Sequence, residues 1–272
     1  MERQMTDERR RTEEEHWRAA EDGGGALASD GGRMSDGGGA LASGGGAQAE
    51  ESKCRRRRDE RSMLPKSFAT VKYNITNTAA ETSGGIRYET QIGFKFAKHT
   101  LKSSNLFIWR LFEQRHKADR ANVTHVDLFI DDMDGVAYCE DNEIHVSSNY
   151  IAGYEGDLKR EFSGVIYHEM THVWQWSGNG STPSGLVEGI ADFVRLKAGY
   201  IPSHWVQPGQ GDKWDQGYDV TARFLDYCEG LRHGFVAELN KKMLYDYSVD
   251  YFVDLVGKTV DQLWSDYKAA YI

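Results

Sequence analysis

The composition of the chain changes sharply near residue 66, and this boundary decides which part of the sequence can form a hydrophobic core. Before it, charged residues accompany a glycine-rich stretch in which the octamer DGGGALAS occurs twice, at 22–29 and 36–43. Such segments have too few apolar side chains to bury. We therefore expect a disordered, Gly-rich and charged tail over 1–66 and one folded domain over 67–272.

The first part of this domain has the residue pattern of β-strands. Segments rich in β-branched and aromatic residues predict strands at 69–76, 86–93 and 123–131, and a hairpin or two short strands at 136–151. One helix is expected among them, at 100–116, where apolar residues recur with helical spacing.

From Leu158 to the C-terminus the sequence predicts helices, with breaks at 178–183, 202–211 and Gly257. Strands followed by helices are typical of α+β domains. We therefore expect an α+β fold. Its N-terminal lobe would combine a mixed β-sheet with the first long helix after the strands, and its C-terminal lobe would be mostly helical.

The helical segment 165–176 contains two histidines four residues apart, His168 and His172, in the pattern H-E-x-x-H. On an α-helix these side chains lie one turn apart on the same face, so two imidazoles can reach one Zn²⁺. Glu169 follows the first histidine and can accept a proton from a water molecule on the metal without being a ligand. The same five residues also occur by chance in helices whose histidines are hydrogen-bonded core residues, so a third ligand is needed to favour the metal site.

Candidates for that ligand follow in the segment GLVEGIAD. Glu188 lies sixteen residues after His172, and Asp192 lies four residues later on the same face of a second helix. In one interpretation Glu188 binds the metal and Asp192 accepts a hydrogen bond from the distal nitrogen of a ligand histidine. In another, Asp192 is the ligand, and in a third both are acidic residues near a helix start. The metzincin continuation H-x-x-G-x-x-H is absent because Gln175 and Gly178 occupy the required positions.

Residues 167–176 and 185–200, YHEMTHVWQW and GLVEGIADFVRLKAGY, resemble the plant basic secretory protein family, also called peptidases of plants and bacteria. The resemblance continues at 118–138, 204–228, 234–243 and 261–271. It implies a zincin-like, zinc-dependent peptidase that acts on peptides or proteins, is usually secreted and is often linked to plant defence. His168, Glu169 and His172 match the motif of the family without substitution.

The resemblance implies secretion, whereas the N-terminus MERQMTDERRRTEEEHW has no apolar core of a signal peptide. As given, the chain therefore predicts no such signal. Cys139 and Cys228 would form one disulfide in an oxidising compartment or remain thiols, and the sequence does not choose between these states.

The charge of the chain argues against nucleic acid as a partner. The net charge is −9, and residues 67–272 carry −8 of it, so the domain is acidic rather than basic. An acidic surface repels phosphates, and we interpret the run Arg55–Arg58, flanked by acidic residues, as part of the solvated tail. No apolar run approaches the ~18 residues that a membrane helix needs.

A peptidase also needs a donor that stabilises the oxyanion of the tetrahedral intermediate. Tyr218 and His233 are the candidates, and Tyr218 is preferred because it lies in the family-like segment WDQGYDVTARF. The alternative for Tyr218 is a packing residue whose hydroxyl bonds to backbone.

The sequence therefore predicts a zinc metallopeptidase. The residues expected to act are His168, His172 and Glu188 as ligands, Glu169 as general base, Asp192 beside a ligand histidine, and Tyr218 as oxyanion donor. The alternative is a catalytically silent zincin that retains zinc and acts in binding or defence. Substrate specificity and the choice between endo- and exopeptidase are left open.

Overall fold

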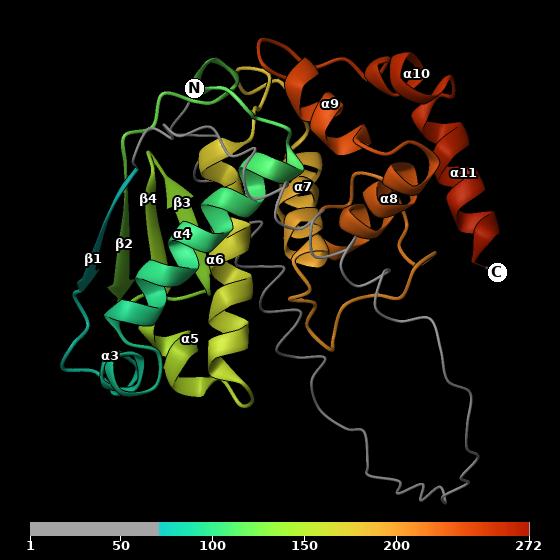
Figure 1. The fold of residues 1–272 in the computed structure, drawn as a ribbon. Coiled ribbons are helices and arrows are strands. Elements are labelled where there is room, and N and C mark those ends of the chain that lie inside the picture. The colour runs from blue at the N-terminus through green and yellow to red at the C-terminus, as the bar shows by residue number, and fades with distance from the viewer. Residues whose placement is uncertain (1–70, 272) are drawn as a thin grey trace, which may run out of the picture. The chain divides into compact units, whose positions relative to one another are not determined.

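The computed structural model describes residues 71–271. The predicted tail over 1–66, with the run Arg55–Arg58, lies outside the described residues. Within 71–271 a four-stranded sheet comes first and most helices follow, which confirms the expected α+β fold (Figure 1). No helix in this range is both long and apolar enough to cross a membrane.

The sheet has the strand order β1-β2-β4-β3. In that order its strands are Lys72–Asn77, His125–Asp131, Glu143–Ser147 and Ala137–Glu140. The first three are parallel to their neighbours, and β3 runs antiparallel to β4 at the edge, so the sheet is mixed, as expected. The strands predicted at 69–76 and 123–131 are present. The segment 136–151 forms the β3–β4 hairpin and then enters the short helix α5 (Ser148–Gly153).

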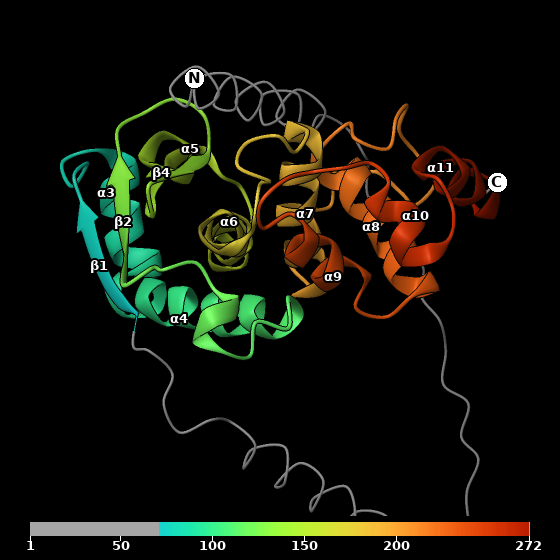
Figure 2. The ribbon, with the colours of Figure 1, turned by 90° about the horizontal axis from the view of Figure 1, so that it is seen from above.

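Side chains alternate along β2, and this alternation places one face of the sheet in the core. Val126, Leu128 and Ile130 on that face are fully buried. The helices α4 (Phe94–Leu111) and α6 (Leu158–Trp174) pack on the sheet and on each other. Figure 2 shows α6 end-on, between the strands and the helices that follow it in the chain. The helix that carries the H-E-x-x-H residues is therefore central.

The strand predicted at 86–93 is wrong. Ser83–Arg87 form helix α3, and Tyr88–Ile92 continue as a single π-helical turn. Gly84 permits a close approach of α3 to α5, because a Cβ at this position would lie 1.7 Å from the backbone oxygen of Ser148. Helix α3 thus packs closely against α5, a segment distant in sequence.

The C-terminal part is helical, as predicted. Its helices, orange to red in Figure 1, are α7 (Ser184–Lys197), α8 (Tyr218–Leu231), α9 (Phe235–Lys242), α10 (Tyr251–Val256) and α11 (Val260–Ala270). α7 packs on α6, α8 packs on α7, and α9 and α11 pack on α8. The predicted breaks at 178–183 and 202–211 fall largely in the loops before and after α7. α10 ends at Gly257, whose φ of 71° is left-handed.

Cys139 lies on β3 and Cys228 in α8, and no disulfide joins these two residues. Burial raises the pKa of the Cys228 thiol, and the charge of Glu229 adds to the effect, because both disfavour the thiolate. Cys228 is therefore an inert core thiol.

Candidate metal centre

The site is built on α6, which is capped at its start and buried along most of its length. The Asp157 carboxylate accepts a hydrogen bond of 3.0 Å from the backbone N–H of Arg160, one of the donors that a helix start leaves without a partner. From Phe162 to Trp174 every residue except His172 is buried. A helix packed on all sides holds its side chains within narrow limits, as a catalytic or metal site requires.

A buried ion pair holds α7 against α6. The Arg195 side chain on α7 is 0% exposed, and its Nη2 donates to both carboxylate oxygens of Glu161 on α6, each at 2.9 Å. Its Nε donates to the backbone oxygen of Tyr200. Removing one partner of such a pair leaves an uncompensated buried charge and costs about 3–5 kcal/mol. The pair therefore fixes how the two helices meet, one turn from Asp192.

Three donor atoms from these helices converge. His168 Nε2 lies 3.1 Å from Glu188 Oε2, and His172 Nε2 lies 3.5 Å from the same oxygen. One ligand atom of each residue lies within 4.8 Å of the other two. The side chains of His168, His172 and Glu188 are each 1% exposed. Two imidazoles and one carboxylate in this arrangement can hold a divalent cation.

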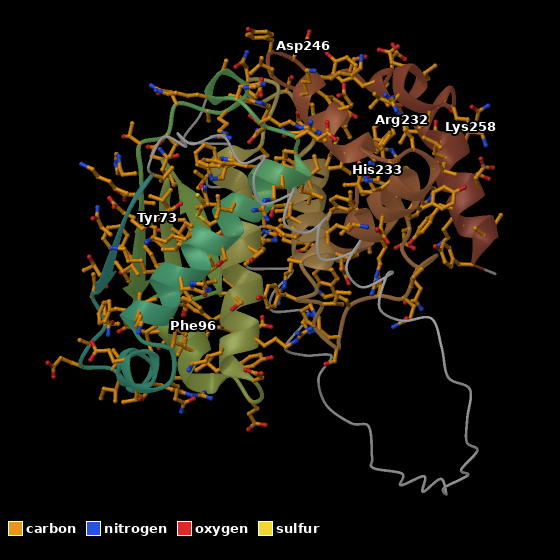
Figure 3. The ribbon with its side chains drawn as sticks, viewed as in Figure 1. Tyr73, Phe96, Arg232, His233, Asp246 and Lys258 are labelled. Carbon is orange, nitrogen blue, oxygen red and sulfur yellow. The ribbon has the colours of Figure 1, made fainter. Side chains whose placement is uncertain are left out.

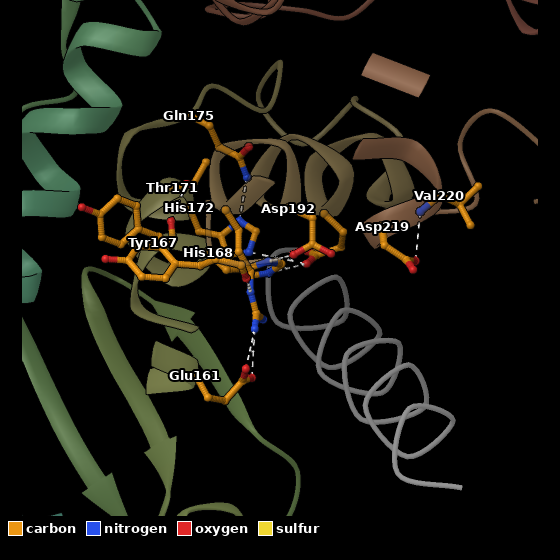
Figure 4. A network of polar contacts seen from close by, with 12 residues as sticks. Glu161, Tyr167, His168, Thr171, His172, Gln175, Asp192, Asp219 and Val220 are labelled. Atoms are coloured by element: carbon orange, nitrogen blue, oxygen red, sulfur yellow. Dashed lines mark hydrogen bonds and ion pairs between the residues drawn. The ribbon is translucent and has the colours of Figure 1, made fainter. Parts of the chain in front are cut away.

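The opposite ring nitrogens of the two histidines have different partners. His168 Nδ1 lies 2.7 Å from Asp192 Oδ1, and His172 Nδ1 lies 2.6 Å from the side-chain amide nitrogen of Gln175 (Figure 4). Glu188 and Asp192, one turn apart on α7, therefore face opposite nitrogens of one ring. Gln175 was not among the predicted residues. No sequence signal identified it, because Gln175 lies just beyond the end of α6, in an extended conformation, where helical spacing does not apply.

Carboxylates surround the His168 ring. Glu169, Glu188 and Asp192 are each 1% exposed. Burial acts to lower the pKa of His168. The charge and hydrogen bond of Asp192, the hydrogen bond of Glu188 and the charge of Glu169 outweigh it and hold this pKa well above its usual value. The centre of the cluster therefore favours positive charge.

Tyr218 begins α8 and lies beside the cluster. Its ring is nearly parallel to that of His168, with 6.1 Å between the centroids, and the residue is 3% exposed. Its φ of 44° is left-handed, a conformation that costs a non-glycine residue on the order of 1–3 kcal/mol. Asp219 accepts hydrogen bonds from the backbone N–H groups of Val206 and Val220, and these hold the strained start of α8.

His233, the other candidate donor, is not part of this group. It lies exposed in the turn between α8 and α9 (Figure 3). Of the predicted site residues, the structure thus brings together His168, His172, Glu188, Asp192 and Tyr218, and buries Glu169 beside His168.

Comparisons with known proteins agree with the resemblance seen in the sequence. The family described as peptidase of plants and bacteria matches residues 68–267, which is most of the chain and all of the site. A basic secretory protease from Boswellia serrata is 52% identical over 59 residues, covering 22% of this chain and 67% of that protein. No solved structure matches. On the family match, the chain belongs to the peptidases of plants and bacteria, the basic secretory protein family.

Proposed function

We propose that the protein is a zinc-dependent peptidase in which His168, His172 and Glu188 hold Zn²⁺. The observation that carries this proposal is the convergence of their donor atoms within 4.8 Å. Two imidazoles and one carboxylate are a ligand set of catalytic zinc, which keeps a further position open for water or substrate. The surroundings fit a divalent cation, because the three buried carboxylates near the histidines need compensating positive charge.

Asp192 would act on the metal centre through His168. A hydrogen bond from Nδ1–H to its carboxylate keeps the proton on Nδ1 and leaves the Nε2 lone pair facing Glu188. We therefore assign Glu188, not Asp192, as the third ligand. The support is that Glu188 faces the Nε2 atoms of both histidines, whereas Asp192 contacts the opposite side of one ring.

Glu169 is the general base of the proposed reaction. Bound Zn²⁺ would polarise the peptide carbonyl and lower the pKa of the attacking water. Glu169 accepts the proton of that water and passes it to the leaving amine. Tyr218 donates a hydrogen bond to the oxyanion, a role supported by its buried position beside His168 and its strained backbone.

The test compares the full-length protein with Glu169→Gln after both are loaded with zinc. An unstructured protein such as casein serves as substrate, and bound zinc is measured in each sample. We expect equal zinc content and a loss of about 10²–10⁴-fold in cleavage, because Gln cannot accept the proton. Cleavage by the variant at the wild-type rate would overturn the mechanism. Zinc binding by both without any cleavage would instead assign a zinc-retaining binding protein.

The site of action is a further part of the proposal. The related protein from Boswellia serrata is named a secretory protease. We propose on that basis that this protein also acts outside the cell, and the implied role in plant defence stays a prediction. Expression of the full gene in plant cells, with detection in the apoplastic fluid, tests the location.

A further inference from the structure

The Nδ1 atoms of the two proposed ligand histidines contact chemically different groups. Asp192 is a carboxylate and can only accept a hydrogen bond from His168. Gln175 is an amide, which can donate through Nε2 or accept through Oε1. Its Nε2 faces His172 Nδ1 at 2.6 Å, while its Oε1 is buried and has no hydrogen-bond partner among the described residues.

The end of α6 explains why Gln175 reaches the ring. The helix ends at Trp174, and Gln175 leaves it in an extended conformation, with φ −79° and ψ 154°. Its own N–H still donates to the Thr171 carbonyl at 2.8 Å, and its side chain reaches back to His172 in the last turn. Gln114 donates to the Trp174 carbonyl at 3.0 Å, and Gln114 is itself 3% exposed. The exit from the helix is therefore fixed from a neighbouring segment.

The direction of the Gln175–His172 hydrogen bond depends on where the imidazole proton lies. When Nε2 carries the proton toward Glu188, Nδ1 accepts from the amide N–H. This tautomer fits the amide orientation in Figure 4, where the amide nitrogen of Gln175 faces Nδ1. When Nε2 gives its lone pair to a metal, Nδ1 must carry the proton and needs an acceptor. Turning the amide by 180° about its last bond supplies Oε1 as that acceptor and gives this buried oxygen a partner. The two amide ends have nearly the same shape, and the turn leaves Nε2 in the place that Oε1 held.

We propose that Gln175 is a positioning residue for His172, and that its amide turns over when the site takes up a metal. In the loaded state its Oε1 accepts the Nδ1–H of His172 and holds the Nε2 lone pair toward the metal. The inference rests on the proposed zinc site. It adds that the two ligand histidines are oriented by different groups. His172 contacts a neutral amide that can turn over, and His168 contacts the carboxylate of Asp192, which can only accept a hydrogen bond.

The experiment measures the dissociation constant of Zn²⁺ by competition with a chelator, using full-length wild type, Gln175→Met and Gln175→Glu. Met fills the volume but accepts no proton of His172, and we expect zinc to bind about 10–100-fold more weakly. Glu has only acceptors, so we expect binding within about threefold of wild type, or tighter. Equal weakening by Met and Glu would overturn the proposal, and so would wild-type affinity in Gln175→Met.

Gln114→Met is the matched control. It removes a buried amide that holds the same helix end but does not touch His172. We expect a lower melting temperature with zinc affinity unchanged, and a loss equal to that of Gln175→Met would assign the effect to the helix end. Nitrogen chemical shifts of His172 should move from the Nε2–H to the Nδ1–H form on zinc addition. Absence of zinc binding by the wild type would reject the proposed function itself, whereas zinc binding without the Met–Glu difference would reject only the role of Gln175.

Discussion

Glu188 and Asp192 are both buried carboxylates on α7, and they differ in which nitrogen of His168 they face. That difference is the reason for assigning Glu188 as a ligand and Asp192 as a group that orients a ligand. A ligand contributes a bond to the metal, while the orienting group acts only on the tautomer and angle of the ring. The loss of an orienting group typically costs 10–100-fold in metal affinity.

At the scale of the residue we predict that Asp192→Asn weakens zinc binding about 10–100-fold. Glu188→Gln should weaken it more, because it removes a ligand charge from the centre of the cluster. The dissociation constants are measured by chelator competition, with Asp226→Asn as a control. Asp226 is a partly exposed carboxylate of α8 that pairs with Lys197 and makes no contact with the ligand residues in the interactions described, and its change should leave affinity unchanged. The reverse order of Glu188 and Asp192 would make Asp192 the ligand.

At the scale of the element, the packing of α8 on α7 sets the positions of Glu188 and Tyr218 relative to each other. Gly189 follows Glu188, and a Cβ at Gly189 would lie 2.2 Å from Cγ2 of Thr221. The Thr221 hydroxyl accepts from the N–H of Gly217 and donates to the carbonyl of Trp214. Thr221 therefore cannot move away without loss of the bonds that hold the start of α8.

We accordingly predict that Gly189→Ala destabilises the protein. The intrinsic helix preference of Ala over Gly is worth about 1 kcal/mol, whereas overpacking a core contact costs about 1–3 kcal/mol. The free energy of unfolding should fall, as measured by urea denaturation. Adding Thr221→Ser, which removes Cγ2 but keeps the hydroxyl and the Cβ contact of 2.4 Å, should restore part of it.

Gly230→Ala in α8 is the control for that series. A Cβ at Gly230 meets nothing within 4 Å, so this change should be neutral or stabilising. A Gly189→Ala protein as stable as Gly230→Ala would show that the helices separate without cost.

At the scale of the whole molecule, the site lies entirely within residues 71–271, and the family match begins at residue 68. We predict that deleting 1–66 changes the melting temperature by less than about 2 °C, which for a domain of this size corresponds to less than about 1 kcal/mol. Calorimetry on both forms, with zinc bound, checks this. A larger fall would show that the first 66 residues contribute to the fold, against the boundary proposed from composition.

Local sequence patterns were enough to predict much of the secondary structure of this fold. The strands at β1, β2 and the β3–β4 hairpin follow from runs of β-branched residues, and α6 follows from its apolar stripe. The strand predicted at 86–93 was wrong because β-branched and aromatic content does not decide between strand and helix over so few residues. In the structure this segment is helical, and Arg87 within it donates to backbone carbonyls of Ile151, Ala152 and Tyr154, which are distant in sequence.

The sequence by itself determined that His168 and His172 share one helix face, because a spacing of four residues has that consequence in any α-helix. It could not separate Glu188 from Asp192, since the same spacing places both on one face of α7. Only the packing of α7 on α6 decided that one carboxylate faces Nε2 and the other Nδ1 of His168. The positions of Gln175 and Tyr218 likewise depended on where a helix ends and on which helix lies across from it, and these are set by contacts between distant segments.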